Sequence, residues 1–351
     1  MQWWFCGTKR AVNYLSHHNW FCWSRSSSCS CGRILGIGYC KFGYGFPAFG
    51  NRLQRFTLKK INEALTYSGY NVAWKIVRLL PAKTAYGLAD RFADYLYGRN
   101  GKAIVRLRSN YQRVRPELDS DEIEFLVSAG MRSYLRYWCD TFRFPSWSKE
   151  DLISSTTCTN EDFLREPIAA KRGCIVALPH AGNWDHAGAY FCTTGIQFTT
   201  VAEHLKPEKL FRKFLEYRTK IGMEVLDLNS RSIATLSQRL RSGKLVALVA
   251  DRDLSKNGIP VKFFGDGAQM PGGPALLAIQ TGADLITAYV KYEKSGIHIL
   301  FEGAIKVPES GSVNEKAAAM TQIMADRFAK QIAANTVDWH MLQRIWVDSD
   351  A

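Results

Sequence analysis

One of the seven histidines occupies a position that is typical of a catalytic base. His180 follows the short apolar run Cys174–Leu178, and the next residues, Ala181-Gly-Asn-Trp-Asp185, pass through a Gly/Asn turn into a helical pattern. Ligands of α/β proteins usually bind where the carboxyl end of a strand meets the N-terminus of a helix. Such a turn can face the imidazole into a cleft and return the Asp185 carboxylate to its other ring nitrogen, giving a general base and its orienting group. A buried histidine beside an N-capping Asp explains the same spacing, and the residues alone leave both interpretations open.

The elements that must position this turn alternate between short β-branched runs and helical patterns. We expect strands at 174–178, 198–202, 245–250, 285–290 and 298–301, and helices at 207–223, 230–242, 274–281 and 313–334. Strands that alternate with helices imply a sheet whose two faces are covered. The predicted fold class is therefore α/β, with a central mostly parallel sheet flanked by helices and a helical N-terminal section.

That N-terminal section consists of predicted helices with apolar stripes and basic faces. The spacing predicts helices over 61–80, 82–97 and 102–114, and Asp119-x-x-Glu122 is typical of a capping box that opens a fourth helix. Residues 61–119 carry ten basic and five acidic residues. Basic amphipathic helices suit a peripheral protein on an anionic bilayer, although solvated helix faces packed on the domain explain the same pattern.

The charge of the chain is concentrated in its first third. The formal net charge is +14, yet residues 1–60 hold nine Lys and Arg with no acid, and residues 120–351 hold 27 charges of each sign. A basic nucleic-acid-binding body is therefore disfavoured. The remaining alternative of this class is a surface-binding or nucleic-acid-binding module in the N-terminal arm, which predicts a steep salt dependence.

Residues 1–55 differ in composition from the rest of the chain. They hold four of the ten Trp, five of the nine Cys and several Gly-rich pieces, without helical or strand periodicity. This low-order basic extension is either a targeting or surface-binding arm, or it is a disordered extension or a stretch translated from a misassigned start; we favour the latter two over the arm. The predicted domains are then the extension at 1–55 and one domain at 61–347, with membrane-facing helices at 61–145 and a catalytic α/β core at 173–347.

The turn at His180 also carries a family resemblance. His180-Ala-Gly-Asn-Trp-Asp185 resembles the His-x4-Asp motif of glycerophospholipid and lipid A acyltransferases. Further motifs follow in the order of that superfamily: Val201-Ala-Glu203, Arg218-x-x-x-Gly222, Ala250-Asp-Arg-Asp253, Val261-Lys-Phe-Phe-Gly265, Pro271-Gly-Gly-Pro-Ala275, Thr281-Gly-Ala283, Asp338-Trp-His340 and Arg344-Ile-Trp346. The resemblance covers about residues 65–347.

Two of these motifs are most similar to those of one group within the superfamily. The motifs at Ala250–Asp253 and Pro271–Pro274 resemble those of actinobacterial phosphatidylinositol mannoside acyltransferases. Lipid A enzymes generally begin with a membrane-spanning helix, and no apolar run of sufficient length occurs in this sequence. Acylation of lipid A or of another glycolipid remains the alternative. A serine hydrolase ranks low because the sequence contains no Gly-x-Ser-x-Gly motif.

The resemblance implies acyl transfer from acyl-CoA to a mannose hydroxyl of a phosphatidylinositol mannoside, at the cytoplasmic face of the plasma membrane. His180 would take the hydroxyl proton, and Asp185 would hold the imidazole tautomer. Neither an acyl-enzyme nor a metal is needed, and acyl-CoA serves as co-substrate without a further cofactor. Backbone N–H groups near Gly182–Asn183 or Pro271–Gly273 are the candidate donors to the oxyanion.

The resemblance also marks residues that could bind substrate: Glu203, Arg218, Asp251, Arg252 and Asp253. Glu203 and Arg218 could hold the sugar-phosphate headgroup or form a structural ion pair with each other. Arg252 could bind a phosphate with two hydrogen bonds, or the trio Asp251–Asp253 could cap the sheet edge. We expect Phe263 and Phe264 to fill the core, and we expect His186, His204 and Trp184 to have structural roles.

Overall fold

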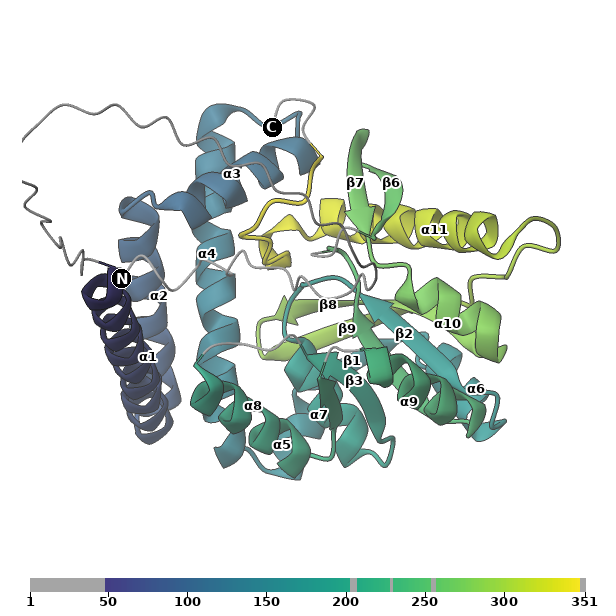
Figure 1. Cartoon of the computed structure of the whole chain (residues 1–351), viewed down its shortest axis with the longest axis horizontal. Coiled ribbons are helices and arrows are strands. Elements are labelled where there is room, and N and C mark those ends of the chain that lie inside the picture. The colour runs from purple at the N-terminus through teal and green to yellow at the C-terminus, as the bar shows by residue number, and fades with distance from the viewer. Residues whose placement is uncertain (1–47, 203–206, 228–229, 254–256, 348–351) are drawn as a thin grey trace, which may run out of the picture. The chain divides into compact units, whose positions relative to one another are not determined.

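The structure is a computed structural model that describes residues 48–202, 207–227, 230–253 and 257–347 (Figure 1). Within this part of the chain, residues 66–347 belong to one compact unit, and residues 48–65 belong to another and are helical. Most of the predicted extension at 1–55, together with Glu203 and His204, lies outside the described residues.

The helical N-terminal section is confirmed. It consists of α1 (Ala48–Leu79), α2 (Ala82–Gly98), α3 (Lys102–Val114) and α4 (Ser120–Arg143). Helix α1 begins at Ala48 rather than at Ile61, so the helix extends into a stretch whose sequence shows no clear period. The predicted capping box is present, because the Asp119 side chain accepts from the Glu122 backbone N–H and the Glu122 side chain accepts from that of Asp119.

Aromatic packing joins residues 66–79 of α1 to the rest of the compact unit that they belong to. The Trp74 ring lies 5.3 Å from the ring of Phe142 on α4 and 5.6 Å from that of Phe214 on α8 (Glu208–Lys220). Trp74 is buried by these contacts. Burial of a large aromatic side chain contributes on the order of 2 kcal/mol, which fixes this part of α1 against α4.

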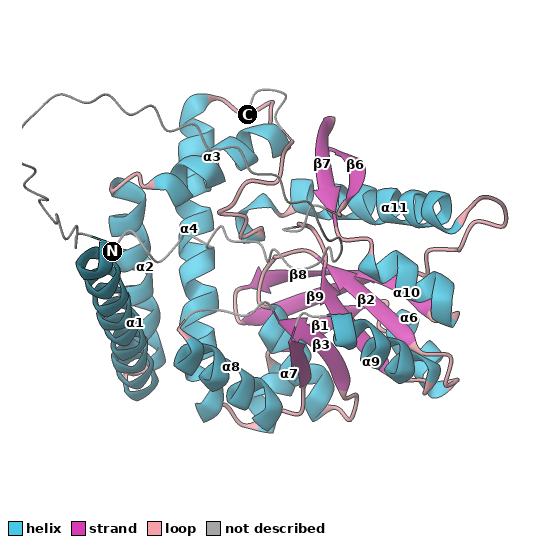
Figure 2. Cartoon of the chain, in the orientation of Figure 1, coloured by secondary structure: helices cyan, strands magenta, loops and turns pink. Residues whose placement is uncertain are grey.

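A seven-stranded sheet with the order β1-β9-β8-β2-β5-β3-β4 forms the core of residues 66–347. Figure 2 shows its strands among the flanking helices. All neighbouring strands run parallel except the β8–β9 hairpin, so the predicted mostly parallel sheet is confirmed. A separate antiparallel pair is formed by β6 and β7. The strands are β1 (Thr156–Thr159), β2 (Cys174–Leu178), β3 (Phe198–Ala202), β4 (Glu224–Asp227), β5 (Leu245–Val249), β6 (Ile259–Phe263), β7 (Asp266–Met270), β8 (Asp284–Glu293) and β9 (Gly296–Glu302).

Helices cover both faces of this sheet. Helices α9 (Ser230–Arg241), α10 (Gly273–Thr281) and α11 (Val313–Ala334) contact one face, and α6 (Asp162–Ala169) and α7 (Trp184–Thr193) contact the other. Strand β2 is buried along its whole length, and its side chains alternate between the two faces, with Ile175 in one core cluster and Val176 in the other. The remaining short helices are α5 (Lys149–Ser154), η1 (Phe144–Ser146) and η2 (Thr336–Asp338).

Elements without a long apolar run have no clear signal in the sequence. Strand β1 reads Thr-Thr-Cys-Thr, and no residue of β4 is fully buried, because these strands form the two edges of the sheet. The β6–β7 hairpin alternates buried and exposed residues over only five positions in each strand. Phe263 is fully buried in this hairpin, which confirms its predicted place in the core.

Candidate active site

The register of two neighbouring strands brings His180 and Asp251 together. Strands β2 and β5 are parallel neighbours in which Leu178 pairs with Val249, and each of the two side chains comes two residues later. The Ala250 N–H continues the ladder by donating to the Leu178 carbonyl at 2.9 Å. The two residues therefore lie side by side at the carboxyl edge of the sheet, the edge where parallel α/β sheets bind ligands.

Asp251 holds the imidazole of His180 in one orientation. His180 Nδ1 lies 2.6 Å from Asp251 Oδ1, and the His180 backbone N–H donates to Asp251 Oδ2 at 3.0 Å. The Trp339 indole Nε1 also donates to Oδ2 at 3.0 Å, and Asp251 is completely buried. We assign the ring proton to Nδ1, which donates a hydrogen bond to the Asp251 carboxylate, so the neutral ring presents an unprotonated Nε2. His180 itself is partly exposed, and a base of this form is ready to accept a proton from an incoming hydroxyl.

The environment of Asp251 favours its charged form. Burial by itself raises the pKa of this carboxyl, but the His180 charge and the hydrogen bonds from His180 and Trp339 outweigh the burial. The pKa of Asp251 therefore lies below its ordinary value. A carboxylate that stays ionised can stabilise the imidazolium that forms when His180 takes up a proton.

The prediction that Asp185 orients the imidazole is corrected by this geometry. Asp185 is buried in the first turn of α7 and accepts two hydrogen bonds from Arg218, from Nε at 2.9 Å and from Nη2 at 3.0 Å. The Tyr137 hydroxyl donates to the same carboxylate at 2.9 Å. Asp185 belongs to α7, whereas Asp251 and His180 directly follow two neighbouring strands at the same edge of the sheet.

The loop that carries His180 is fixed by a glycine and by the C-terminal segment. Gly182 has a φ of +55°, and a Cβ there would lie 2.4 Å from the carbonyl oxygen of Val290, so only glycine fits. The Gly182 N–H donates to the Asp338 carbonyl at 2.8 Å, and the His340 N–H donates to the His180 carbonyl at 2.8 Å. The Gly182 N–H is thus engaged and is not a ready oxyanion donor.

A buried polar chain lies next to this loop. The Ser133 hydroxyl donates to Asp338 Oδ1 at 2.7 Å and contacts His340 Nε2 at 2.9 Å. Because the hydroxyl proton goes to the carboxylate, we assign the His340 proton to Nε2. Burial lowers the pKa of His340 to about 3, so this imidazole is neutral near pH 7. The motif Asp338-Trp-His340 was noted in the sequence, but its return to the His180 loop follows only from the fold.

The other residues singled out in the sequence differ in burial and in the partners that they contact. Arg218 pairs with Asp185, while Arg252 and Asp253 are half-buried in the segment directly after Asp251. His186 is buried against the hydroxyls of Ser155 and Thr156, in agreement with its predicted structural role. Trp184 stacks on Tyr137 at a ring distance of 4.4 Å and, as predicted, packs against the turn.

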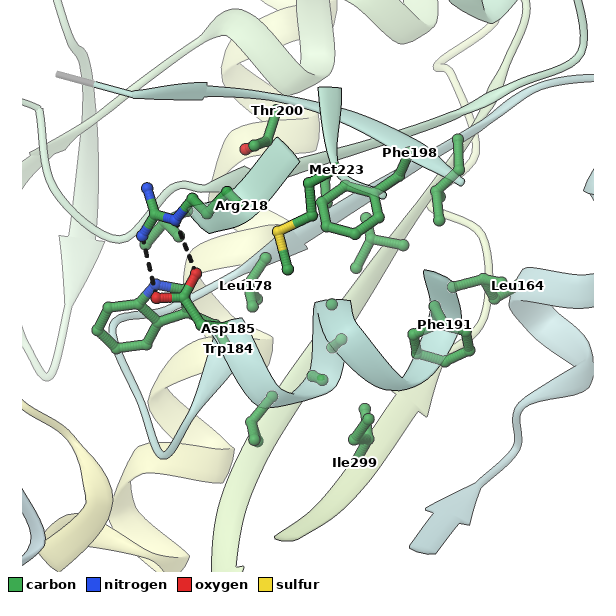
Figure 3. A pocket seen from close by; sticks show the side chains of 18 of the residues that line it. Leu164, Leu178, Trp184, Asp185, Phe191, Phe198, Thr200, Arg218, Met223 and Ile299 are labelled. Atoms are coloured by element: carbon green, nitrogen blue, oxygen red, sulfur yellow. Dashed lines mark hydrogen bonds and ion pairs between the residues drawn. The ribbon is translucent and has the colours of Figure 1, made fainter. Parts of the chain in front are cut away.

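An apolar cavity of about 100 Å³ lies between α7 and the sheet (Figure 3). The Trp184 ring lies 5.5 Å from the imidazole of His180 and lines the cavity, and the Asp185–Arg218 pair lies at the same end. Gly188 provides part of the space, because a Cβ there would lie 2.6 Å from Met223 Cε and 2.8 Å from Phe198 Cζ. The other lining residues are mostly aliphatic and aromatic: Leu164, Val176, Leu178, Ala187, Phe191, Phe198, Met223, Leu245, Val290, Ile299 and Phe301.

A histidine–aspartate pair beside an apolar cavity is an arrangement that could move an acyl chain onto a hydroxyl group. A family model described as bacterial lipid A biosynthesis acyltransferase matches residues 55–348. The chain belongs to this family and is an acyltransferase. The resemblance drawn from the motifs is thereby confirmed.

Two relatives match most of their own length. The chain is 40% identical over 286 residues to a phosphatidylinositol mannoside acyltransferase of Mycolicibacterium smegmatis, a match that covers 81% of this chain and 92% of the relative. It is 38% identical over 303 residues to a protein of the same name from Mycobacterium tuberculosis strain H37Rv, covering 85% of this chain and 94% of that relative.

Proposed function

We propose that this acyltransferase transfers a fatty acyl group from acyl-CoA to a mannose hydroxyl of a phosphatidylinositol mannoside, with His180 as general base and Asp251 as its positioning residue. The observation that carries the proposal is the 2.6 Å contact between His180 Nδ1 and the buried Asp251 carboxylate, beside the apolar cavity. The names of the two relatives support the choice of acceptor.

The reaction follows from this arrangement as a direct transfer. The acceptor hydroxyl loses its proton to His180 Nε2 while its oxygen attacks the thioester carbon. The tetrahedral intermediate then collapses, the carbon–sulfur bond breaks, and the CoA thiolate leaves with the proton from the imidazolium. Asp251 remains ionised throughout and stabilises the imidazolium, as the buried aspartate of a Ser-His-Asp triad does.

The apolar cavity is our candidate binding site for the acyl chain. Its walls are made by both α7 and the sheet, and the charged residues among those that line it, Asp185 and Arg218, neutralise each other at one end. Burial lowers the pKa of Arg218, but Asp185 together with Tyr137 and Tyr217 raises it by more, so the guanidinium stays charged within this pair. A chain that enters past Trp184 places its thioester beside the imidazole. We therefore assign Asp185 and Arg218 to shaping the cavity entrance rather than to the proton transfer.

The proposed function is tested with purified full-length protein, palmitoyl-CoA and a mannosylated phosphatidylinositol, with the lipid product measured by mass spectrometry. His180→Ala is expected to lower transfer by about 10²–10⁴-fold, the usual contribution of a general base. His298→Gln is the matched control, because His298 contacts Thr157 and Thr159 on the edge strand β1. Full activity of the His180→Ala protein would refute the proposal.

The acceptor is tested separately by supplying lipid A precursors and mannosylated phosphatidylinositol to the same protein. The family description names lipid A biosynthesis, so this is the second candidate acceptor. Transfer to the mannosylated lipid alone supports the proposal. Transfer to the lipid A precursor alone would replace the acceptor but keep the role of His180.

We also propose that the N-terminal helices attach the enzyme to an anionic membrane surface at the cytoplasmic side. Among the described residues, no helix is long and apolar enough to cross a bilayer. Val72, Ile76 and Leu79 of α1 are exposed, and Leu79 is 84% exposed. Leu88 and Phe92 of α2 are also exposed, and basic residues lie close to both groups in the sequence: Lys75, Arg78, Lys83 and Arg91. Exposed apolar side chains flanked by basic ones are typical of helices that bind a lipid surface.

Flotation with phosphatidylinositol-containing vesicles tests this attachment. Leu79→Glu is expected to weaken vesicle binding by about tenfold, because a carboxylate replaces a side chain that would enter the lipid and repels the anionic surface. Val313→Glu on α11 is the matched control, since Val313 is 51% exposed but belongs to a helix on the sheet. Equal binding by the wild-type and Leu79→Glu proteins would exclude this surface.

A further inference from the structure

A second, polar cleft lies between the N-terminal helices and the sheet. It has a volume of about 750 Å³ and is lined by residues of α2, α4, α7, the β8–β9 hairpin and η2, together with Trp147 and Ser155. This volume is within the range of roughly 300–1,000 Å³ that is usual for small-molecule sites. Neither His180 nor Asp251 lines the cleft, and its lining differs from that of the apolar cavity in being rich in charges and hydroxyls.

The charges that line the cleft balance in number. Three of the lining residues are acidic and three are basic: Asp90, Asp140, Asp338, Arg132, Arg136 and Lys294. Such a lining offers donors and acceptors together without a strong preference for one sign. Polyhydroxylated ligands use both, since every hydroxyl donates and accepts, whereas a phosphate would favour a lining of one sign.

The polar groups of the cleft are held rigidly. Asp140 is buried and accepts hydrogen bonds from the hydroxyls of Tyr86 and Tyr292 and from the Asn183 amide. The Arg136 guanidinium lies 3.9 Å above the Tyr292 ring and donates to the Glu293 carbonyl at 3.0 Å. Groups fixed in advance lose little conformational entropy when a ligand binds, which favours a weakly held ligand such as a sugar.

Two residues that line the cleft, Asp140 and Asp338, also hold the loop that carries His180. Asp140 holds Asn183, the N-cap of α7, through a hydrogen bond of 3.2 Å. Asp338 holds Gly182 through its carbonyl, while its side chain accepts from Ser133. The cleft therefore adjoins the His180 loop on a side that the apolar cavity does not occupy, and an occupant there contacts the same rigid frame.

We propose that this cleft is a second, non-catalytic site that binds the carbohydrate part of a glycolipid. A neutral sugar of one or two rings matches its volume, its balanced charges and the presence of the Trp147 side chain in its lining. The choice of a mannose-containing probe rests on the proposed function, whereas the assignment of the cleft to a sugar rests on its lining.

Calorimetry with the full-length protein and mannobiose, without an acyl donor, tests this assignment. We expect a dissociation constant on the order of 1 mM, which corresponds to about −4 kcal/mol. Ala89→Trp fills the cleft from α2 and is expected to weaken binding at least tenfold. Leu88→Trp is the matched control, because the neighbouring Leu88 is 46% exposed and does not line the cleft. Lys294→Ala, a change in an exposed turn, is expected to weaken binding several-fold and serves if Ala89→Trp does not fold.

The same variants separate this site from the proposed reaction. Acyl transfer to methyl mannoside, which is too small to span two sites, should stay within about twofold in the Ala89→Trp protein. Loss of that transfer together with mannobiose binding would make the cleft the acceptor site and overturn the proposal. Unchanged mannobiose binding in both variants, or binding of inositol phosphate instead of mannobiose, would also overturn it. Binding that is lost in Ala89→Trp supports the cleft site even if no transfer activity is found.

Discussion

The two carboxylates near His180 have different roles at the scale of single residues. Asp251 contacts the imidazole, whereas Asp185 pairs with Arg218 and lines the apolar cavity. Both are buried acids that accept several hydrogen bonds, so their burial alone does not distinguish them. Their partners do, because only a carboxylate on Nδ1 fixes the tautomer that leaves Nε2 free to act as a base.

Substitution of each acid by its amide separates these roles. Asp251→Asn keeps the shape but removes the negative charge beside the imidazole, and we expect the kcat to fall by about 10²–10⁴-fold. Asp185→Asn leaves the Arg218 charge buried without its partner, and we expect a loss of about 3–5 kcal/mol of stability. Steady-state kinetics and thermal unfolding of both proteins check this pair of outcomes. If Asp185→Asn lowers kcat as far as Asp251→Asn at a temperature where both are folded, the assignment of Asp251 fails.

The sequence selected His180 as a candidate site residue, and its predicted contact with Asp185 is replaced in the structure by a contact with Asp251. The position after a buried strand and before a Gly/Asn turn is visible locally, so His180 could be predicted. Asp251 was selected only as a substrate-binding candidate, because its approach to His180 depends on β2 and β5 being neighbours. Strand order results from long-range packing across 71 residues of separation and leaves no local pattern in the chain.

At the scale of elements, α7 both carries the motif and forms a wall of the apolar cavity. Its N-terminus is capped by the Asn183 side chain, which accepts from the His186 N–H at 2.9 Å. One turn further on, Ala187 and Gly188 face the sheet and line the cavity. Larger side chains at these two positions would fill the space between the helix and the strands, so the cavity depends on their small size.

Gly188→Ala is predicted to shorten the acyl chain that the enzyme accepts. The new Cβ would push the flexible Met223 side chain and the Phe198 ring into the cavity. A change of one methylene in an apolar pocket alters selectivity by about 10–200-fold, so we expect kcat/KM for palmitoyl-CoA to fall at least tenfold while that for acetyl-CoA changes little. Competition between acyl-CoAs of different lengths measures this effect. Gly87→Ala on α2 is the control, because a Cβ there meets nothing, and an equal loss for long and short chains would contradict the assignment of the cavity.

At the scale of the whole molecule, the central sheet and its covering helices were predictable, whereas the edges were not. Buried strands such as β2 are apolar along their full length, and long amphipathic helices such as α11 show a clear period and a capping box. The edge strands β1 and β4 and the short helices α5 and α6 contain few buried residues, so their formation depends on contacts with the rest of the fold. The polar cleft also had no signal in the sequence, since its lining residues come from six helices and strands that are separated in sequence.

Two buried histidines couple the stability of the molecule to pH. Burial lowers the pKa of His186 to about 4 and that of His340 to about 3, below the ordinary value of 6.5. Between about pH 6.5 and pH 4 the unfolded chain therefore binds protons at these positions that the folded chain does not. Each such proton lowers the free energy of unfolding by up to about 1.4 kcal/mol per pH unit as the pH falls, whereas the stabilisation is complete at and above about pH 7.

A variant isolates one of these histidines from the carboxylates that titrate in the same range. Burial raises the pKa of Asp140 and Asp338, and this acts in the opposite direction on acidification, so the pH dependence of the wild-type protein alone is ambiguous. Urea unfolding at pH 7, 6 and 5 measures how the free energy of unfolding depends on pH. We expect this free energy to fall less steeply with decreasing pH for His186→Gln than for the wild-type protein, and the difference in slope should approach that of one bound proton. Glutamine can still donate to Ser155 or Thr156, and the carboxylates are the same in both proteins. Parallel pH profiles for the two proteins would contradict the prediction, because they would mean that His186 is protonated equally in the folded and unfolded chains. We expect a difference because His186 is buried between η1, α5 and β1.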